Sequence, residues 1–173
     1  MTKYNNNELN TMITEHINEN QFIISKSDKE FIVAFTHALE EMGYIYGETI
    51  GNGFCWGKYM LIFRKANAKS KNVVARIYVR ADSIVLRLFF NNVTKHSDYI
   101  DSTPENIKNV FVGKYGTCTH CKGDNCKFRK DYEISGTKFE KCNGTTFEFY
   151  NPNVERLPDY IELFREFYPV KGA

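Results

Sequence analysis

Four of the five cysteines fall within a stretch of twenty-five residues. They are Cys118, Cys121, Cys126 and Cys142, and their spacing is C-x2-C-x4-C-x15-C. A C-x2-C pair lets one tight turn direct two sulfur atoms at a single ion, and four thiolates at tetrahedral angles suit Zn²⁺. A closed shell of four cysteines leaves no coordination position for water or substrate. The pattern therefore predicts a structural zinc site whose binding free energy helps to fold the loop.

Other interpretations of these cysteines stay open. An iron–sulfur cluster also takes four cysteines, although this spacing fits neither common ferredoxin pattern. A redox-active Cys118/Cys121 pair would lack the usual βαβ setting. His120 in place of one cysteine would leave an open position and turn the interpretation towards catalysis. Disulfides are disfavoured because no export signal is recognisable, and Cys55 is expected to be a small buried apolar residue.

The charge is unevenly distributed along the chain. The net charge is +2, but residues 1–50 carry −5, residues 51–141 carry +9 and residues 142–173 carry −2. A basic middle between acidic ends predicts an anionic partner for the middle, or docking of the unlike parts on one another. No apolar run is long enough to span a bilayer, and the first residues lack an apolar signal region, so we expect a cytoplasmic protein without a membrane partner.

The hydrophobic periodicity predicts an α+β fold with a mainly antiparallel sheet flanked by helices, together with a cysteine-rich metal-binding loop and a short hairpin. We expect helices over 8–18, from a capping box at Ser27, from Ser102, and over 157–167. We expect strands over 58–66, 72–80, 83–91, 132–135, 138–142 and 145–150. The last three strands are expected to join at Ser135-Gly136 and Asn143-Gly144, since both are turn-forming pairs. One domain over 1–173 is expected, with a metal-stapled subregion at 114–150.

Strand alternation gathers basic and aromatic side chains on one face of the predicted sheet. Arginine pairs with phosphate and an aromatic ring stacks on a base, so such a face is suited to nucleic acid or another anion. The predicted contacts are Arg76, Tyr78, Arg80 and Arg87 on the strands and Lys127 and Arg129 on the cysteine loop. The alternative is that Tyr78 and Phe89 form a covered cross-strand pair, over which the arginines pack.

Two further classes of function are compatible with the sequence. A curved sheet with helices on one side can leave an aromatic cleft, and Tyr44, Trp56 and Tyr59 are candidates to line it in a small-ligand-binding regulatory domain. An enzyme with an unrecognised site is the weakest hypothesis, because neither His37 nor His96 has a neighbouring nucleophile or paired carboxylate in a recognised arrangement. A zinc-containing binding protein without catalytic activity is the preferred interpretation.

Several short motifs between Lys58 and Pro169 carry a resemblance. They are Arg76-Ile77-Tyr78-Val79-Arg80, Leu86-Arg87-Leu88, the cysteine loop, and Cys142-Asn143-Gly144 with Phe147-Glu148-Phe149. In these the chain resembles small uncharacterised bacterial proteins that carry a cysteine-rich insert in an α+β domain. The resemblance implies no activity, substrate or catalytic residue.

Overall fold

The computed structural model of the chain describes residues 24–47, 51–53, 56–65, 72–113, 129–141 and 146–169, with the single positions 11 and 15. All five cysteines and most of the predicted helix over 8–18 lie outside these ranges. The chain divides into two compact units, which are described separately. Unit 1 comprises Met1–Leu88 and Glu148–Glu162, and unit 2 comprises Phe89–Phe147 and Leu163–Ala173.

Helix α2 (Lys26–Glu41) opens the described part of unit 1. The predicted capping box placed its start at Ser27, but the cap is Ser25, whose Oγ accepts a hydrogen bond from the Asp28 N–H at 3.1 Å. Ser25 has the extended backbone that a cap requires, whereas Ser27 already belongs to the first turn. The helix ends at Glu41 with Met42 as its C-cap, and Gly43, which has a left-handed φ of 81°, supplies the predicted stop.

The main sheet is built from six strands in the order β1-β3-β4-β5-β8, with β2 also paired to β3. Their bounds are β1 Tyr44–Tyr46, β2 Gly51–Asn52, β3 Tyr59–Lys65, β4 Val73–Val79, β5 Ile84–Phe89 and β8 Thr146–Tyr150. Strands β1, β2 and β4 each pair antiparallel with β3, and β4 pairs antiparallel with β5. The three long central strands and the α+β class are therefore confirmed. Strands β1 and β2 were not predicted, because two or three residues are too few to show a period.

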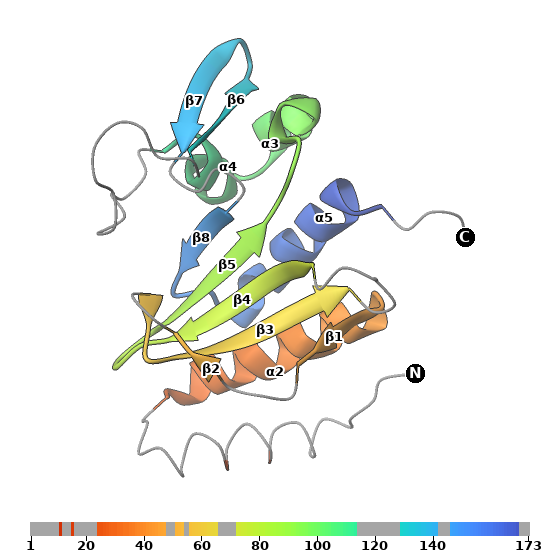
Figure 1. Cartoon of the computed structure of the whole chain (residues 1–173). Helices are drawn as coiled ribbons and strands as arrows, with labels where there is room; N and C mark the ends of the chain where they lie inside the picture. The colour runs from red at the N-terminus through yellow and green to blue at the C-terminus, as the bar shows by residue number, and fades with distance from the viewer. Residues whose placement is uncertain are drawn as a thin grey trace. The chain divides into compact units, whose positions relative to one another are not determined.

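Helix α2 covers one face of β1, β3 and β4 (Figure 1). The ring of Phe35 meets the ring of Phe63 edge-on, with centroids 5.3 Å apart. Phe31 packs against Phe35 and, at 5.9 Å, against Tyr160 of helix α5 (Leu157–Phe167). Burial raises the pKa of Tyr160 to about 12. This dry side of the sheet is the hydrophobic core of unit 1.

The described part of unit 2 contains the last residues of α5, three complete helical elements and a separate hairpin. The complete elements are η2 (Val93–His96), α3 (Ser97–Ser102), α4 (Glu105–Val112), β6 (Lys130–Ile134) and β7 (Thr137–Lys141). The core is aromatic: Phe90 stacks on Phe167 at 4.2 Å and Phe111 packs on Phe147 at 4.3 Å. The Tyr132 hydroxyl donates to the Phe111 carbonyl, and burial raises the pKa of Tyr132. Helix α3 was not predicted, because only Ile100 of its six residues is buried and no apolar stripe results.

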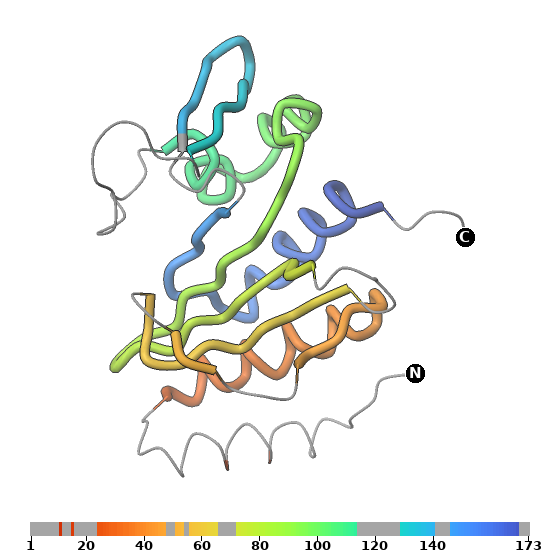
Figure 2. The backbone as a smooth tube through the Cα atoms, in the orientation of Figure 1, coloured from red at the N-terminus to blue at the C-terminus, as the bar shows by residue number. Residues whose placement is uncertain are grey.

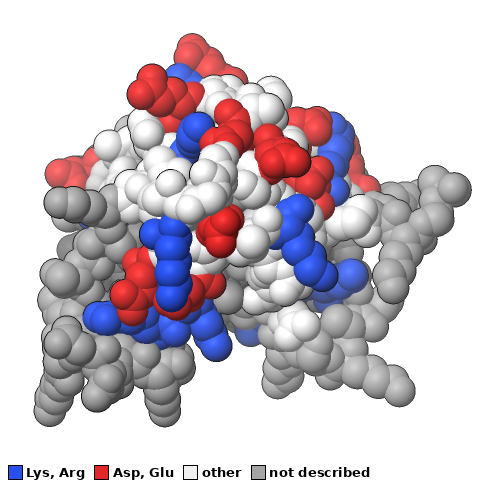
Figure 3. Space-filling model, turned by 90° about the horizontal axis from the view of Figure 1, so that it is seen from above, with Lys and Arg blue, Asp and Glu red and all other residues white. Residues whose placement is uncertain are grey.

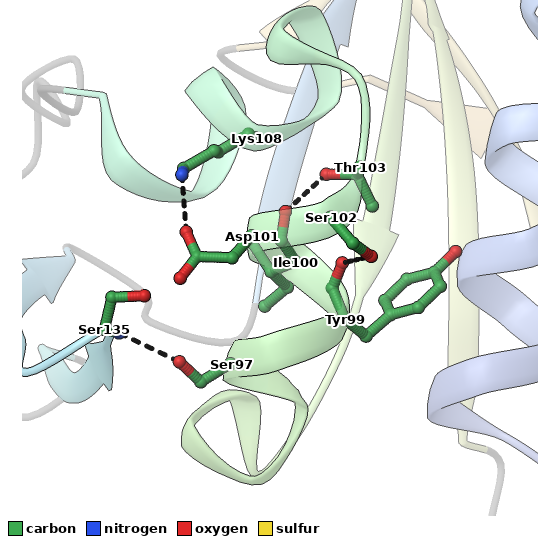
Figure 4. A network of polar contacts seen from close by, with 8 residues as sticks. All are labelled: Ser97, Tyr99, Ile100, Asp101, Ser102, Thr103, Lys108 and Ser135. Atoms are coloured by element: carbon green, nitrogen blue, oxygen red, sulfur yellow. Dashed lines mark hydrogen bonds and ion pairs between the residues drawn. The ribbon is translucent and has the colours of Figure 1, made fainter.

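The hairpin turns at Ser135-Gly136, as predicted, and Figure 2 traces its tight path. Both residues have left-handed φ angles, 49° and 75°, which match a two-residue primed turn. The hairpin rests on hydroxyl groups of the preceding elements. The Glu133 N–H donates to Thr94 Oγ1 at 3.0 Å, and the Ser135 N–H donates to Ser97 Oγ at 2.9 Å (Figure 4). Two side-chain hydroxyl groups thereby accept hydrogen bonds from backbone N–H groups of β6 and of the turn that follows it.

The sequence predicted that the strands on either side of Asn143-Gly144, which are β7 and β8, pair as a hairpin, and this prediction is wrong. Strand β7 pairs with β6 in a two-stranded sheet, whereas β8 belongs to the six-stranded sheet. Phe147 and Phe149 of β8 are buried there, so apolar burial decides which sheet β8 joins. Asn143 and Gly144 themselves are not among the described residues. No described helix is long and apolar enough to cross a membrane.

Candidate binding face

The face of the unit 1 sheet that lies opposite α2 carries a buried ion pair. Arg76 and Arg87 are direct cross-strand partners in β4 and β5, and like charges in that position repel each other. Glu148 on β8 supplies the opposite charge, with its Oε1 atom 2.7 Å from Arg87 Nε. The side chains of Arg87 and Glu148 are each only 5% exposed. The charge of Arg87 is therefore neutralised within the protein.

Trp56 covers this ion pair. Its ring centre lies 4.3 Å from Arg87 Cζ, which is cation–π geometry, and 6.3 Å from the ring centre of Tyr78. Gly57, the next residue, allows the backbone to approach β4 closely. A side chain at that position would clash, because its Cβ atom would lie only 2.7 Å from the Val79 carbonyl oxygen. The neighbouring Lys58 N–H donates to that same oxygen at 2.9 Å. The close approach of the backbone to β4 thus brings Trp56 onto the sheet.

Tyr78 lies beneath this surface and not on it. The residue is 1% exposed and belongs to a core cluster with Met60 and Val85. Arg76, which is half-buried, donates from Nη1 to the Tyr78 hydroxyl at 3.1 Å. The cross-strand partner of Tyr78 is Val85, so the alternative pairing with Phe89 is not formed. Tyr78 and Arg87 therefore support the face from within.

The accessible part of this face lies beside Trp56. Arg80, half-buried, donates from Nε to the Trp56 carbonyl oxygen at 3.0 Å. Its Cζ atom lies 5.4 Å from the centre of the Tyr150 ring, and Tyr150 is 58% exposed. The neighbouring cation Lys58 is directed elsewhere, because its Nζ atom lies 5.3 Å from the centre of the Tyr59 ring. We call Arg76, Arg80 and Tyr150 the basic–aromatic rim.

The predicted cations of the cysteine loop contribute less to such a surface. Lys127 lies outside the described residues, and Arg129 forms an ion pair with Glu140 at 3.2 Å. Lys138 lies 2.6 Å from Asp131, and the hydrogen bond and charge of that carboxylate raise the pKa of Lys138. On the side of the molecule shown in Figure 3, acidic and basic side chains are interspersed. The described part of 129–141 is thus locally balanced in charge.

The three residues expected to line an aromatic cleft are not brought together. Tyr44 is buried on β1, and burial raises its pKa. The registers place Tyr44 and Tyr59 on the same side of the sheet as Phe63, which is the side that α2 covers. Trp56 packs with Met60 and Tyr78 on the opposite side. The described residues therefore provide no common cleft for the three rings.

The predicted zinc ligands are not among the residues that the structure describes. Among those that are, no group of three or more His, Cys, Asp or Glu side chains is placed to hold a metal ion. Two histidines have carboxylate neighbours: His37 lies 3.9 Å from Glu40, and His96 lies 2.7 Å from Glu166. The structural zinc site therefore stays a prediction from the cysteine spacing.

Comparisons with protein-family models, curated proteins and solved structures found no similar protein. Function therefore has to be argued from the chemistry of the face itself.

Sequence reasoning missed Glu148 and Tyr150, which complete this face. Their signal was present: in Thr146–Tyr150, an acidic residue stands between two phenylalanines that are buried in the sheet. Arg87 stands in the same way between Leu86 and Leu88. A charged residue in the middle of an apolar strand calls for an opposite charge on a neighbouring strand. Matching the two positions would have predicted that β8 lies beside β5.

Replacing Glu148 by Gln should destabilise the protein by about 3–5 kcal/mol, because it leaves the guanidinium of Arg87 buried without a counter-charge. The double variant Arg87→Met/Glu148→Leu should recover most of that loss, since apolar residues of similar volume avoid the desolvation cost. Urea unfolding measures both. Glu155→Gln, at an exposed acidic position, is the control and should change stability by less than about 0.5 kcal/mol. A Glu148→Gln variant as stable as this control would contradict the argument.

Proposed function

We propose that the chain is a zinc-containing, non-catalytic binding protein that contacts nucleic acid through the basic–aromatic rim of unit 1. The observation that carries the proposal is the Arg80 guanidinium beside the exposed ring of Tyr150. A cation and an accessible aromatic ring are the two groups with which proteins hold phosphate and base. We assign the protein to the cytoplasm, where reducing conditions keep cysteine thiols available to zinc.

The charge distribution of the face favours an anionic partner. Glu148 neutralises Arg87 in the interior, whereas Arg80 is the cation that lies beside the exposed ring of Tyr150. Within the described residues, Arg80 has no carboxylate partner, and Trp56 holds it through a backbone carbonyl oxygen. A guanidinium fixed through Nε keeps its two Nη groups for a phosphate, which it can bind in bidentate geometry.

The β6–β7 hairpin supports the zinc part of the proposal. Lys130 and Lys141 are Cα partners at the open end of the hairpin. In the sequence, Cys126 lies four residues before Lys130 and Cys142 directly follows Lys141. Two of the four proposed ligands are therefore attached to neighbouring strands at the same end. A shared ion would close that end of the hairpin and stabilise the loop that precedes it.

Replacing Cys121 by Ser should release the metal and lower the thermal stability of the protein, because it removes one of four thiolate ligands. Elemental analysis of the purified protein should find about one zinc per chain in the wild type and far less in the variant. Cys55→Ser is the matched control and should keep its zinc. Full zinc content in Cys121→Ser would exclude Cys121 as a ligand, and iron in place of zinc would favour the iron–sulfur alternative.

Replacing Arg80 by Gln should weaken binding of a labelled oligonucleotide and reduce its dependence on salt. Each phosphate contact that is lost should lower the slope of log K against log salt concentration by about 0.7 for a single strand. Fluorescence anisotropy at several salt concentrations gives both quantities. Lys26→Gln on α2 removes the same charge from an exposed position and should have little effect. The proposal would be contradicted if the two variants lost oligonucleotide affinity to the same extent. It would also be contradicted if the affinity of the wild type did not change with salt concentration.

A further inference from the structure

Among the large hydrophobic residues that the structure describes, Tyr150 has the most exposed side chain. It is 58% exposed, compared with 48% for Ile45 and 42% for Val154. Its backbone is nevertheless fixed, because it ends strand β8 and the next residue, Asn151, donates its N–H to the Ile84 carbonyl oxygen at 3.1 Å. Asn151 has a left-handed φ of 48°, which turns the chain sharply away after Tyr150. A rigid strand end therefore presents an accessible ring.

The cation beside this ring is fixed as well. Arg80 donates from Nε to the Trp56 carbonyl oxygen at 3.0 Å, and its Cζ atom lies 5.4 Å from the centre of the Tyr150 ring. Trp56 in turn lies over the neutralised Arg87, so three successive contacts hold the guanidinium in place. A ring on an anchored backbone, next to a cation that is held in place, lowers the conformational entropy lost when a ligand binds.

A ring at a strand end suits an unpaired base better than a duplex. In a double helix the faces of the bases are stacked on one another, whereas a single strand exposes them to aromatic side chains. Stacking also needs no pattern of hydrogen-bond donors and acceptors, and Arg80 can hold the adjoining phosphate.

We infer that Tyr150 is a base-stacking residue and that the partner of the rim is single-stranded nucleic acid, bound with little sequence preference. This inference rests on the proposed function and names the class of partner for the same site. The contact is between the Tyr150 ring and one base, and Arg80 contacts phosphate.

The experiment compares two labelled single strands of equal length, one with bases and one with abasic sites at every position, and the duplex of the base-bearing strand with its complement. Wild-type protein should bind the base-bearing strand more tightly. Tyr150→Ala should weaken that binding by about 5- to 150-fold, the effect of losing one stacked base, and should leave abasic binding and the salt slope unchanged. Tyr150→Phe should retain the preference for bases, because it keeps the ring. Ile45→Ala, at another exposed position of unit 1, is the matched control.

The outcomes separate the inference from the proposed function. If Tyr150→Ala binds both strands as the wild type does, or weakens both equally, Tyr150 is not a stacking residue, and salt-dependent binding would still support the rim as an anion site. A wild-type protein that binds the duplex more tightly than either single strand also overturns the inference. If the wild type binds none of these nucleic acids, the proposed function fails and the inference fails with it.

Discussion

The face of unit 1 depends on one buried contact, the ion pair between Arg87 of β5 and Glu148 of β8. Arg76 is the direct cross-strand partner of Arg87. If no acidic residue lay beside them, the repulsion between these two cations would destabilise the pairing of β4 with β5. Glu148 supplies the acidic neighbour at 2.7 Å, and the Trp56 ring lies over the guanidinium of Arg87. Removing two charges from water costs free energy that their attraction need not recover. We therefore interpret the pair as specifying that β8 lies beside β5, and not as a source of net stability.

This pair separates the residues that support the face from those that can contact a partner. Arg87, Glu148 and Tyr78 are buried: Arg87 pairs with Glu148, and the Tyr78 hydroxyl accepts a hydrogen bond from Arg76 of the same strand. Arg80 and Tyr150 lie nearer to solvent, and Arg80 is held by the backbone of Trp56. The buried charge of Arg87 is thereby neutralised, whereas the guanidinium of Arg80 is the cation that the proposed anionic partner would contact.

Much of the architecture follows from sequence patterns that need only local information. The period of two over 58–66, 72–80 and 83–91 predicts the central strands, and Ser135-Gly136 predicts its turn, because both signals arise from neighbouring residues. The fate of β8 is different. Asn143-Gly144 suggests a hairpin with β7, but burial of Phe147 and Phe149 places β8 in the main sheet, and only long-range pairing reveals this. The burial of Tyr78 and Arg87 depends on Trp56 in the same way, since alternation gives the face of a residue but not what covers it.

In the proposed binding mode, Arg87 is a neutralised support and Arg80 makes the contact with the partner. Side-chain NMR of arginine Nε–H groups during titration with a single-stranded oligonucleotide tests this most directly. We expect the Arg87 signal to be protected from exchange with water and unmoved by the titration, while the Arg80 signal shifts as binding saturates. Rapid exchange of the Arg87 Nε–H with water, together with a shift at Arg87 and none at Arg80, would contradict the account.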